Sequence, residues 1–328
     1  MKIAIVRLSA LGDIFQSMIV LQFIKKKFPN AEVDWIVDES FQEALKDNSH
    51  INKIIPIPIK KIKKTKSLRE LFQAIKKLRQ LASYDYVFDL QGLIKSSLVA
   101  RLISSKNRIG FDKNSVREKL ASFFYTKKYF IPYHENVIKR YCFLLSQALE
   151  LNIDDVDILQ KESFFNIKKT TKKDGLVVLV LGASFESKIY PSEKYLFIAK
   201  SIDANFIVIW KSDSERIMAQ QLAKKAENII VSEGLSLRQL KELISTVSLV
   251  IGGDTGPTHL AWAMNIPSIT IFGPTPGYRN MFETNINYMV ESTSKVDPYN
   301  INKNDYSMKN IDPKEIITLS RKLLKIRS

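Results

Sequence analysis

The sequence has little cysteine, histidine or glycine, and each shortage excludes a class of protein. One cysteine, Cys142, stands among 328 residues, so no disulfide can form within the chain, which is compatible with a reducing compartment. Cys142 lies in an apolar helical stretch, where a buried thiol is expected rather than a nucleophile. The 3 histidines have no second histidine or cysteine at ligand spacing, so no metal site is predicted. Neither half opens with a three-glycine phosphate fingerprint, which counts against a dinucleotide oxidoreductase.

Long apolar runs are also missing. None approaches the roughly 18 residues that are needed to span a bilayer. The chain begins with the apolar residues 3–6 and reaches the charged Arg7 at once, which predicts a buried strand rather than the core of a signal peptide. We therefore expect any membrane contact to be peripheral.

Acidic residues are few relative to basic ones. The chain has 34 aspartates and glutamates against 50 lysines and arginines, a formal net charge of +16. Such an excess indicates an anionic partner or surface, although lysine enrichment in an AT-rich genome remains an open contribution. No nucleic-acid-binding module or aromatic stacking platform accompanies the basic residues. A phosphorylated glycolipid is therefore favoured over nucleic acid.

Short apolar runs alternate with amphipathic stretches in both halves of the chain, which predicts parallel sheets covered by helices. In the first half we expect strands at 3–8, 33–37, 54–57 and 86–90, and helices at 14–27, 68–81 and 95–103. In the second half we expect strands at 176–181, 206–210, near 229, 249–251 and 268–272, and helices from Ser192, from Ser212 and over 313–326.

A polar, lysine-rich stretch separates the two halves. We therefore predict an N-terminal domain over 1–155, a linker over 156–174 and a C-terminal domain over 175–328. Both domains are expected to be doubly wound, with a cleft between the carboxyl ends of their strands. The last helix is a candidate to pack back on the N-terminal domain.

The run Asp254-Thr255-Gly256-Pro257-Thr258-His259 follows a short apolar strand and opens a predicted helix. Such a turn directs unpaired backbone N–H groups and a positive dipole end at a ligand, so it predicts a phosphate site. His259, one turn inside the helix, is as compatible with a structural role as with a phosphate contact. After the first strand of the same half, Ser184 can bond a phosphate oxygen and Lys188 offers a mobile positive charge. Both are equally typical of an ordinary surface.

Two further residue groups are candidates for chemistry. In the turn at residues 7–13, Gly12 permits the close approach of a ligand, and Asp13 is placed either to act as a general base or only to complement the helix dipole. Glu215 occupies the place where α/β folds often contact a ribose, although a solvated helix surface also explains it.

The run Lys60-Lys61-Ile62-Lys63-Lys64-Thr65-Lys66 is a dense basic patch after a strand-like segment. It is interpreted either as a solvated loop or as a clamp for an acidic acceptor. Lys95 and Arg117 would assist such a clamp.

Taken together, these motifs resemble the bacterial lipopolysaccharide heptosyltransferases. The motifs follow the family's order and span nearly the whole chain. They are Ser9–Asp13, Asp34–Val37, Asp89–Ser96, Gly110–Asp112, Arg117–Ser122, Asp254–Leu260 and Phe272–Thr275.

The resemblance implies a GT-B fold, with two Rossmann-like domains that face a central cleft. It implies an inverting glycosyltransferase that moves heptose from ADP-L-glycero-D-manno-heptose to the Kdo region of Kdo-lipid A, with no metal and no cofactor besides the donor substrate. Such an enzyme would be cytoplasmic and peripheral on the inner membrane, with its basic domain toward anionic lipid. The alternatives are transfer to an already heptosylated acceptor and a non-catalytic binder of an anionic ligand.

The resemblance also assigns roles to residues. It makes Asp13 the base that takes the proton of the acceptor hydroxyl. The donor-binding residues would be Ser184, Lys188, Glu215, Asp254, Thr255, Gly256 and His259, and the acceptor-binding residues Gly12, Lys60, Lys63, Lys64 and Arg117. The chain departs from the family at Phe185, where a second hydroxyl is usual, and at Lys211, where a glycine is usual. These departures concern the diphosphate and adenosine contacts.

Overall fold

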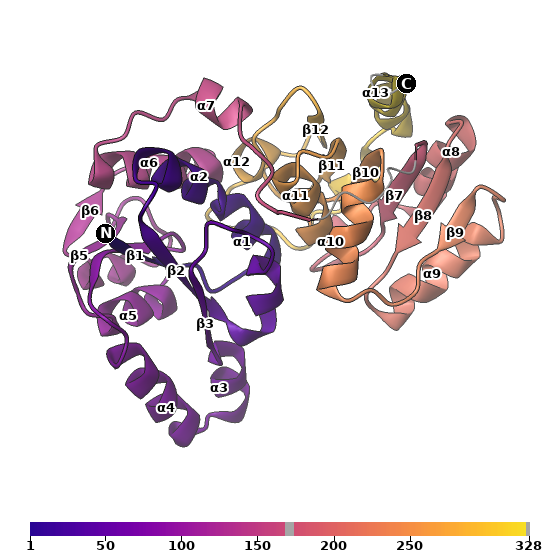
Figure 1. The fold of residues 1–328 in the computed structure, drawn as a ribbon. Helices are drawn as coiled ribbons and strands as arrows, with labels where there is room; N and C mark the ends of the chain where they lie inside the picture. Colours follow the sequence, from indigo (N-terminus) through magenta and orange to yellow (C-terminus); the bar gives the residue numbers. More distant parts are fainter. Residues whose placement is uncertain (168–173, 326–328) are drawn as a thin grey trace. The chain divides into compact units, whose positions relative to one another are not determined.

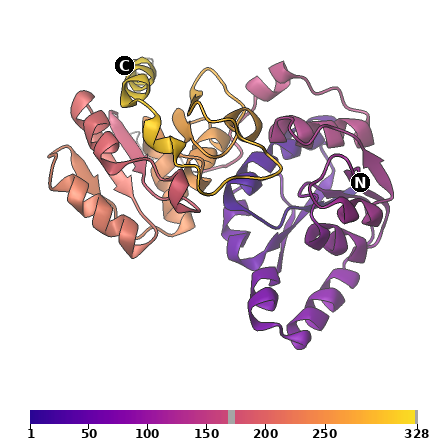
Figure 2. The ribbon, with the colours of Figure 1, turned by 180° about the vertical axis from the view of Figure 1, so that it is seen from behind.

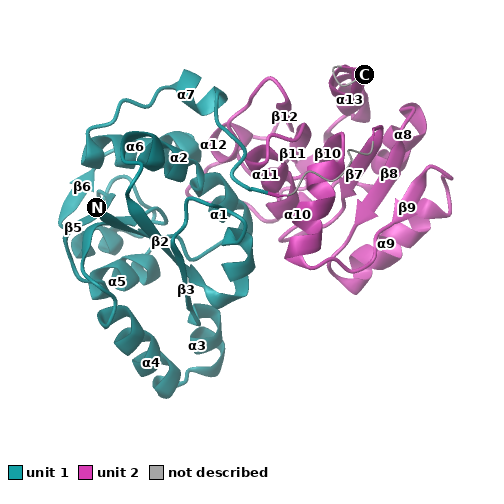
Figure 3. Ribbon diagram, in the orientation of Figure 1, with its two compact units in different colours: residues 1–166 teal, residues 167–328 magenta. Residues whose placement is uncertain are grey.

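The computed structural model describes residues 1–167 and 174–325. The chain divides into two compact units, Met1–Asn166 and Ile167–Ser328 (Figure 3). Within the described residues, each unit is built on a six-stranded parallel sheet. This confirms the predicted α/β class with two doubly wound domains.

The first unit has the strand order β3-β2-β1-β4-β5-β6. Its strands are β1 (Lys2–Val6), β2 (Glu32–Asp38), β3 (Lys53–Ile57), β4 (Tyr84–Asp89), β5 (Ser105–Phe111) and β6 (Lys127–Tyr129). Its helices are α1 (Leu11–Ser17), α2 (Ile19–Lys27), α3 (Ile59–Thr65), α4 (Leu68–Arg79), α5 (Ile94–Leu102), α6 (Val137–Leu149) and α7 (Asp155–Leu159), with 3-10 segments η1 (Glu39–Leu45) and η2 (Lys119–Phe124).

The central strand β1 is apolar on both sides because helices cover both faces of its sheet. Ala4 and Val6 pack in a core cluster with residues of α4 and α5. Side chains alternate along a strand, so the equally buried Ile3 and Ile5 face the opposite side. There α1, α2 and α6 pack against one another (Figure 1 and Figure 2).

The second unit has the strand order β12-β11-β10-β7-β8-β9. Its strands are β7 (Leu176–Val180), β8 (Asn205–Ile209), β9 (Ile229–Val231), β10 (Leu249–Gly253), β11 (Ser268–Phe272) and β12 (Asn287–Glu291). Its helices are α8 (Ser192–Ser201), α9 (Asp213–Ala223), α10 (Leu237–Thr246), α11 (Gly256–Ala263), α12 (Gly277–Asn280) and α13 (Pro313–Lys325), with 3-10 segments η3 (Glu186–Lys188) and η4 (Ser307–Asn310).

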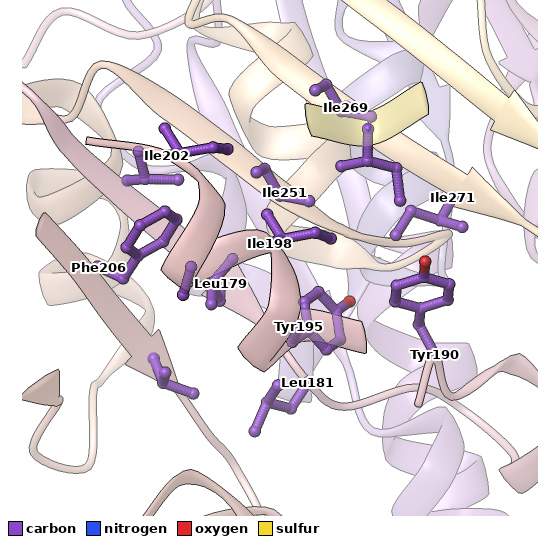
Figure 4. Packing of buried hydrophobic residues seen from close by; sticks show 14 of the residues in the cluster. Leu179, Leu181, Tyr190, Tyr195, Ile198, Ile202, Phe206, Ile251, Ile269 and Ile271 are labelled. Atoms are coloured by element: carbon purple, nitrogen blue, oxygen red, sulfur yellow. The ribbon is translucent and has the colours of Figure 1, made fainter. Parts of the chain in front are cut away.

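The core of the second unit joins its central strands to helix α8. Leu179 of β7, Ile251 of β10 and Ile269 of β11 belong to one buried cluster with Tyr195 and Ile198 of α8 (Figure 4). The hydroxyl of Tyr195 donates to the carbonyl of Val180 at 3.0 Å, so its polar atom is satisfied inside this core.

The predicted start of the linker is corrected. The predicted linker starts inside α7, and residues as far as Phe165 pack on the first unit, where the Phe165 and Phe15 rings meet edge to face at 5.9 Å. The composition there is polar, but Ile158, Phe164 and Phe165 are buried. The later part of the predicted linker, 168–173, lies outside the described residues. The last helix, α13, buries Ile316 and Leu323 in the core of its own unit. Its packing on the N-terminal domain stays a prediction.

The two sheets share one topology. When the six strands of each unit are numbered in chain order, both sheets have the strand order 3-2-1-4-5-6 from one edge to the other. This is the order of a dinucleotide-binding fold. The direction of chain progression reverses between β1 and β4 in the first unit and between β7 and β10 in the second. Ligands bind at the carboxyl ends of the strands at such switch points. The turns that the sequence singled out follow β1, β7 and β10, so they lie at these two places.

Candidate functional site

At the switch point of the second unit, an ion pair joins the segments that follow β7 and β10. The Lys188 Nζ lies 2.8 Å from Asp254 Oδ2 and also donates to the Asp254 carbonyl oxygen at 2.7 Å. Lys188 ends η3, and Asp254 stands between β10 and α11. The contact joins residues that are 66 positions apart in the sequence.

Three more side chains bond to the Asp254 carboxylate. His259 Nε2 lies 2.8 Å from Oδ1, Thr275 Oγ1 donates to Oδ2 at 3.0 Å, and Asn280 Nδ2 donates to Oδ2 at 3.4 Å. The side chains of Lys188, Asp254 and His259 are only 8, 10 and 7% exposed. Burial by itself raises the pKa of Asp254, but Lys188 and His259 outweigh burial and hold the pKa well below its ordinary value. The carboxylate is therefore ionised, and His259 donates its Nε2 proton to it.

This network changes the interpretation of two predicted residues. Lys188 is fixed by Asp254 and is not the mobile cation that the sequence predicted. An ammonium group has three donors, and Asp254 takes two of them, which leaves one for another acceptor. Four side chains bond to the Asp254 carboxylate, which therefore orients Lys188 and His259 around it.

Helix α11 adds backbone donors beside this network. Thr255 is its N-cap residue and Gly256 its first residue, while Thr258 Oγ1 accepts from the backbone N–H of Thr255 at 3.3 Å. Pro257 lacks an N–H and suits the second helical position, where no intrahelical bond is lost. The first turn of a helix leaves N–H groups for outside acceptors and carries a partial positive charge. The turn thus combines a dipole end with the fixed ammonium group of Lys188 and the fixed ring of His259.

Glu215 lies at the start of α9, beside the end of β7. Its Oε2 accepts from the backbone N–H of Lys211 at 2.8 Å, while Ser212 Oγ accepts from the Glu215 N–H at 3.3 Å. Ser212 is thus the N-cap residue of α9, and the Glu215 side chain holds the residue before it. A β-carbon on Gly182 would overlap the Glu215 carboxylate, so glycine is required for this close approach. Glu215 thus lies at the switch point, and capping explains its orientation.

Phe185, the departure from the family pattern, lies between two cations. Lys188 Nζ is 5.6 Å and Lys303 Nζ 5.9 Å from the centroid of its ring. Ser184, the predicted phosphate contact, is exposed beside it. Sequence reasoning missed Lys303 because it lies in an irregular segment of a lysine-rich chain, where no local pattern distinguishes it.

In the first unit, Asp13 is held by a buried arginine. Arg7 Nη2 lies 2.9 Å from Asp13 Oδ2, and the Ala10 N–H donates to the same oxygen at 3.1 Å. The Arg7 side chain is 8% exposed and that of Asp13 is 40% exposed. Arg7 also donates to the Leu90 carbonyl at 2.8 Å, which anchors it to the end of β4. Its burial lowers the pKa of Arg7, but Asp13 outweighs this and raises the pKa overall. Arg7 therefore positions an accessible carboxylate, a role that the sequence analysis had not given it.

The loops after β1 and β4 are tied together by side chains. Gln91 Oε1 accepts from the Leu8 N–H at 2.9 Å, and Gln91 Nε2 donates to Ser9 Oγ at 3.3 Å. Lys95 Nζ also donates to Ser9 Oγ, at 3.2 Å. Gln91 and Ser9 lie in two separate sequence motifs, and the parallel pairing of β1 with β4 brings them together.

The predicted acceptor residues lie near the same edge of this sheet. The pKa of Lys95 is lowered, mainly by burial. Asp38 raises this pKa and Lys63 lowers it, which shows that the charges of both groups lie close enough to Lys95 to affect it. The Asp38 carboxylate accepts from the Lys60 N–H at 2.7 Å. The structure thus brings Lys60 and Lys63, on α3, near the turn that holds Gly12. Lys64 lies on the same helix, and exposed Arg117 precedes η2.

Two findings hold for residues 1–167 and 174–325. They contain no group of three or more His, Cys, Asp or Glu side chains arranged to hold a metal ion. No helix among them has the length and hydropathy of a membrane span.

The fold defines the class of protein. The structure resembles the solved structure of E. coli heptosyltransferase WaaC with ADP, with a TM-score of 0.82 and 23% identity, over 98% of this chain and 100% of that one. The architecture is that of a GT-B glycosyltransferase.

The sequence gives the family. Residues 71–296 match the model of glycosyltransferase family 9 (heptosyltransferase). Lipopolysaccharide heptosyltransferase 1 of Campylobacter coli is 40% identical over 98% of this chain and 99% of its own length. The enzyme of the same name from Pseudomonas aeruginosa is 28% identical over 86% of this chain and 81% of its own length. The chain therefore belongs to glycosyltransferase family 9, and the predicted family, fold and enzyme class are confirmed.

Proposed function

We propose that this protein transfers L-glycero-D-manno-heptose from ADP-heptose to the Kdo region of Kdo-lipid A. The observation that carries this proposal is 40% identity to a lipopolysaccharide heptosyltransferase 1 over nearly the full length of both chains. The two switch-point sites support it. In the proposal the first unit binds the acceptor and the second unit binds the donor.

The donor diphosphate would lie against the first turn of α11. There the remaining donor of Lys188 and the Gly256 N–H would bond to it, while Thr255 and His259 would shape the turn. Ser184 and Glu215 would contact the phosphate and the ribose. As the bond from the anomeric carbon to the phosphate oxygen breaks, negative charge builds on the departing ADP. Preorganised cations and a helix dipole stabilise such charge without reorganisation.

On the acceptor side, Asp13 would take the proton of the attacking hydroxyl. The acceptor oxygen forms the new bond to the anomeric carbon, the bond to ADP breaks on the opposite face, and the proton passes to Asp13. General-base catalysis of this kind lowers the barrier by about 3–5 kcal/mol. Arg7 would hold the carboxylate in place throughout, because it is buried and bonded to the end of β4.

The acidic groups of the acceptor would be bound by basic side chains. Lys60, Lys63 and Lys64 on α3, together with Arg117, are exposed at the sheet edge that holds Asp13. Gly12 leaves room for the sugar. The acceptor is anchored in a bilayer, so we propose that the protein acts as a cytoplasmic, peripheral enzyme on the inner membrane, without a metal cofactor and without a nucleic-acid partner.

The test is a two-acceptor assay. The protein is incubated with ADP-heptose and either Kdo-lipid A or its monoheptosylated product, and the transfer of one heptose is followed by mass spectrometry. We expect turnover of Kdo-lipid A. Turnover of the heptosylated acceptor alone would replace the proposal with the second transfer step, and no turnover of either with retained binding of both would favour a non-catalytic binder. The Asp13→Asn variant is the control for enzyme-dependent transfer.

A further inference from the structure

Large apolar side chains gather on one outer face of the first unit. Single exposed apolar residues are ordinary, but a contiguous group marks an interaction site. Phe72 of α4 is 66% exposed and Phe123 of η2 is 71% exposed. We call the whole set the apolar face; it consists of Leu68, Leu71, Phe72, Leu98, Leu120 and Phe123.

The members of the apolar face come from three neighbouring elements. Helix α4 packs on α5, and α5 packs on η2. Leu68 and Phe72 are four positions apart, so they lie on one side of α4. Leu98 points outward from α5, whose Val99 and Ala100 face the sheet. The exposed apolar side chains therefore belong to one set of neighbouring elements.

Basic side chains are exposed on the same elements and on the segments next to them. Lys128 Nζ lies 5.9 Å from the centroid of the Phe123 ring. The other exposed basic residues of the neighbouring elements are Lys63, Lys64, Lys66, Arg69, Arg101, Lys119 and Lys127. Of the acidic residues nearby, Glu70 pairs with Lys61 at 2.7 Å and Glu118 accepts from the Ile94 N–H at 2.8 Å. Apolar side chains inside a positive rim are complementary to an anionic lipid surface.

The apolar face also begins beside the candidate acceptor site. Glu118, just before η2, bonds to the first residue of α5, and Lys95 in the next position reaches Ser9 after β1. A lipid held at this face would therefore place its headgroup close to the turn that carries Asp13.

We infer that the apolar face docks on an anionic phospholipid bilayer, with Leu68, Phe72 and Phe123 entering the boundary between headgroups and acyl chains. The inference rests on the proposed function in one respect, since it gives a lipid-anchored acceptor its route to Asp13. Burial of apolar area and attraction of basic residues to anionic lipid act together here, and each alone gives weak binding.

The test uses sedimentation with sucrose-loaded vesicles of phosphatidylethanolamine and phosphatidylglycerol, without donor or acceptor. The test variant is Phe72→Ser with Phe123→Ser. The matched control is Phe197→Ser with Ile217→Ser on the second unit, where the side chains are 48 and 56% exposed. We expect the test variant to bind vesicles at least about tenfold more weakly, which is about 1.4 kcal/mol. The control is expected to stay within about twofold of the wild type.

Three outcomes would overturn the inference. They are failure of the wild type to bind protein-free vesicles, unchanged binding by the test variant, and a wild-type oligomer that the test variant dissociates in sedimentation velocity. Thermal melting checks that both variants fold.

An activity arm separates this inference from the proposed function. The test variant should keep its turnover of a soluble, de-acylated acceptor and lose turnover of the same acceptor in vesicles. If neither acceptor is heptosylated by the wild type, the proposed function fails while the vesicle result still decides the docking surface.

Discussion

Replacing Lys188 by methionine removes a cation from the buried network at the switch point of the second unit and leaves the Asp254 carboxylate behind. Both side chains are at most 10% exposed, so water screens their interaction little. Breaking a buried ion pair costs about 3–5 kcal/mol. His259, Thr275 and Asn280 still bond to the carboxylate, so we expect the lower end, about 3 kcal/mol. For a unit of this size that corresponds to a fall in melting temperature of roughly 6–12 °C.

A double-mutant cycle isolates the pair. Asp254→Asn leaves Lys188 without its counter-ion and is expected to cost about 2 kcal/mol, because a lysine can also lose its proton. The double variant strands no charge, so its cost should be about 3 kcal/mol, which gives a coupling energy of about 2 kcal/mol. The free energies of unfolding come from urea titrations at pH 7. A coupling energy below about 0.5 kcal/mol would refute the argument that the ion pair stabilises this unit.

The same pair predicts a pH dependence. The pKa of Asp254 is lower in the folded protein than its ordinary value of 3.8, so the folded state binds fewer protons than the unfolded state in acid. The ionised Asp254 carboxylate contributes its full stabilisation of the folded state above the ordinary pKa. This contribution is lost as the pH falls toward the folded-state pKa. The difference in unfolding free energy between wild type and Lys188→Met should therefore be largest at pH 7 and shrink below about pH 4. An equal difference at pH 7 and in acid would contradict the assignment.

Three further predictions concern activity. Asp13→Asn should lower kcat by about 10²–10⁴-fold while calorimetry finds ADP affinity within about twofold of wild type, and retained turnover would remove Asp13 as the base. Lys63→Gln should raise KM for the acceptor several-fold with kcat unchanged, and by less at high salt; a change in kcat alone would speak against acceptor binding. Gly182→Ala should displace Glu215 and weaken ADP binding about tenfold, roughly 1.4 kcal/mol, whereas Gly234→Ala, whose added β-carbon meets only ordinary contacts, should not. Equal affinities of the two variants would show that Glu215 does not contact the nucleotide.

The central strands could be predicted from the sequence because burial on both faces makes them continuous apolar runs. Strand β5 and the edge strands β6 and β12 were missed because they are partly exposed and mix polar with apolar residues. The predicted helix at 14–27 is two helices, α1 and α2, because the helix is interrupted at Met18. The lysine run after β3, interpreted as a loop or a clamp, forms helix α3, because Ile59 and Ile62 lie three positions apart and pack on the core.

For the candidate site, spacing along the chain was informative only over short distances. Arg7 and Asp13 stand in one turn, and their pairing was within reach of the sequence. The capping of α9 by Ser212 and the bond from Lys211 to Glu215 were also local. Lys303 beside Phe185 was not, because no local pattern places an irregular segment against a distant ring.

The sequence by itself determined the family, the two doubly wound domains and the turns at which ligands are expected, because apolar periodicity and strand-to-helix turns are local properties of the chain. Only the tertiary structure decided what the charged residues in those turns do. Lys188 and Asp254 meet because β7 and β10 are parallel neighbours, and this contact turns a predicted mobile cation into a fixed one. The apolar face likewise exists only because α4, α5 and η2 pack in one layer. Long-range pairing of this kind depends on which strands are neighbours, and no local pattern in the sequence records it.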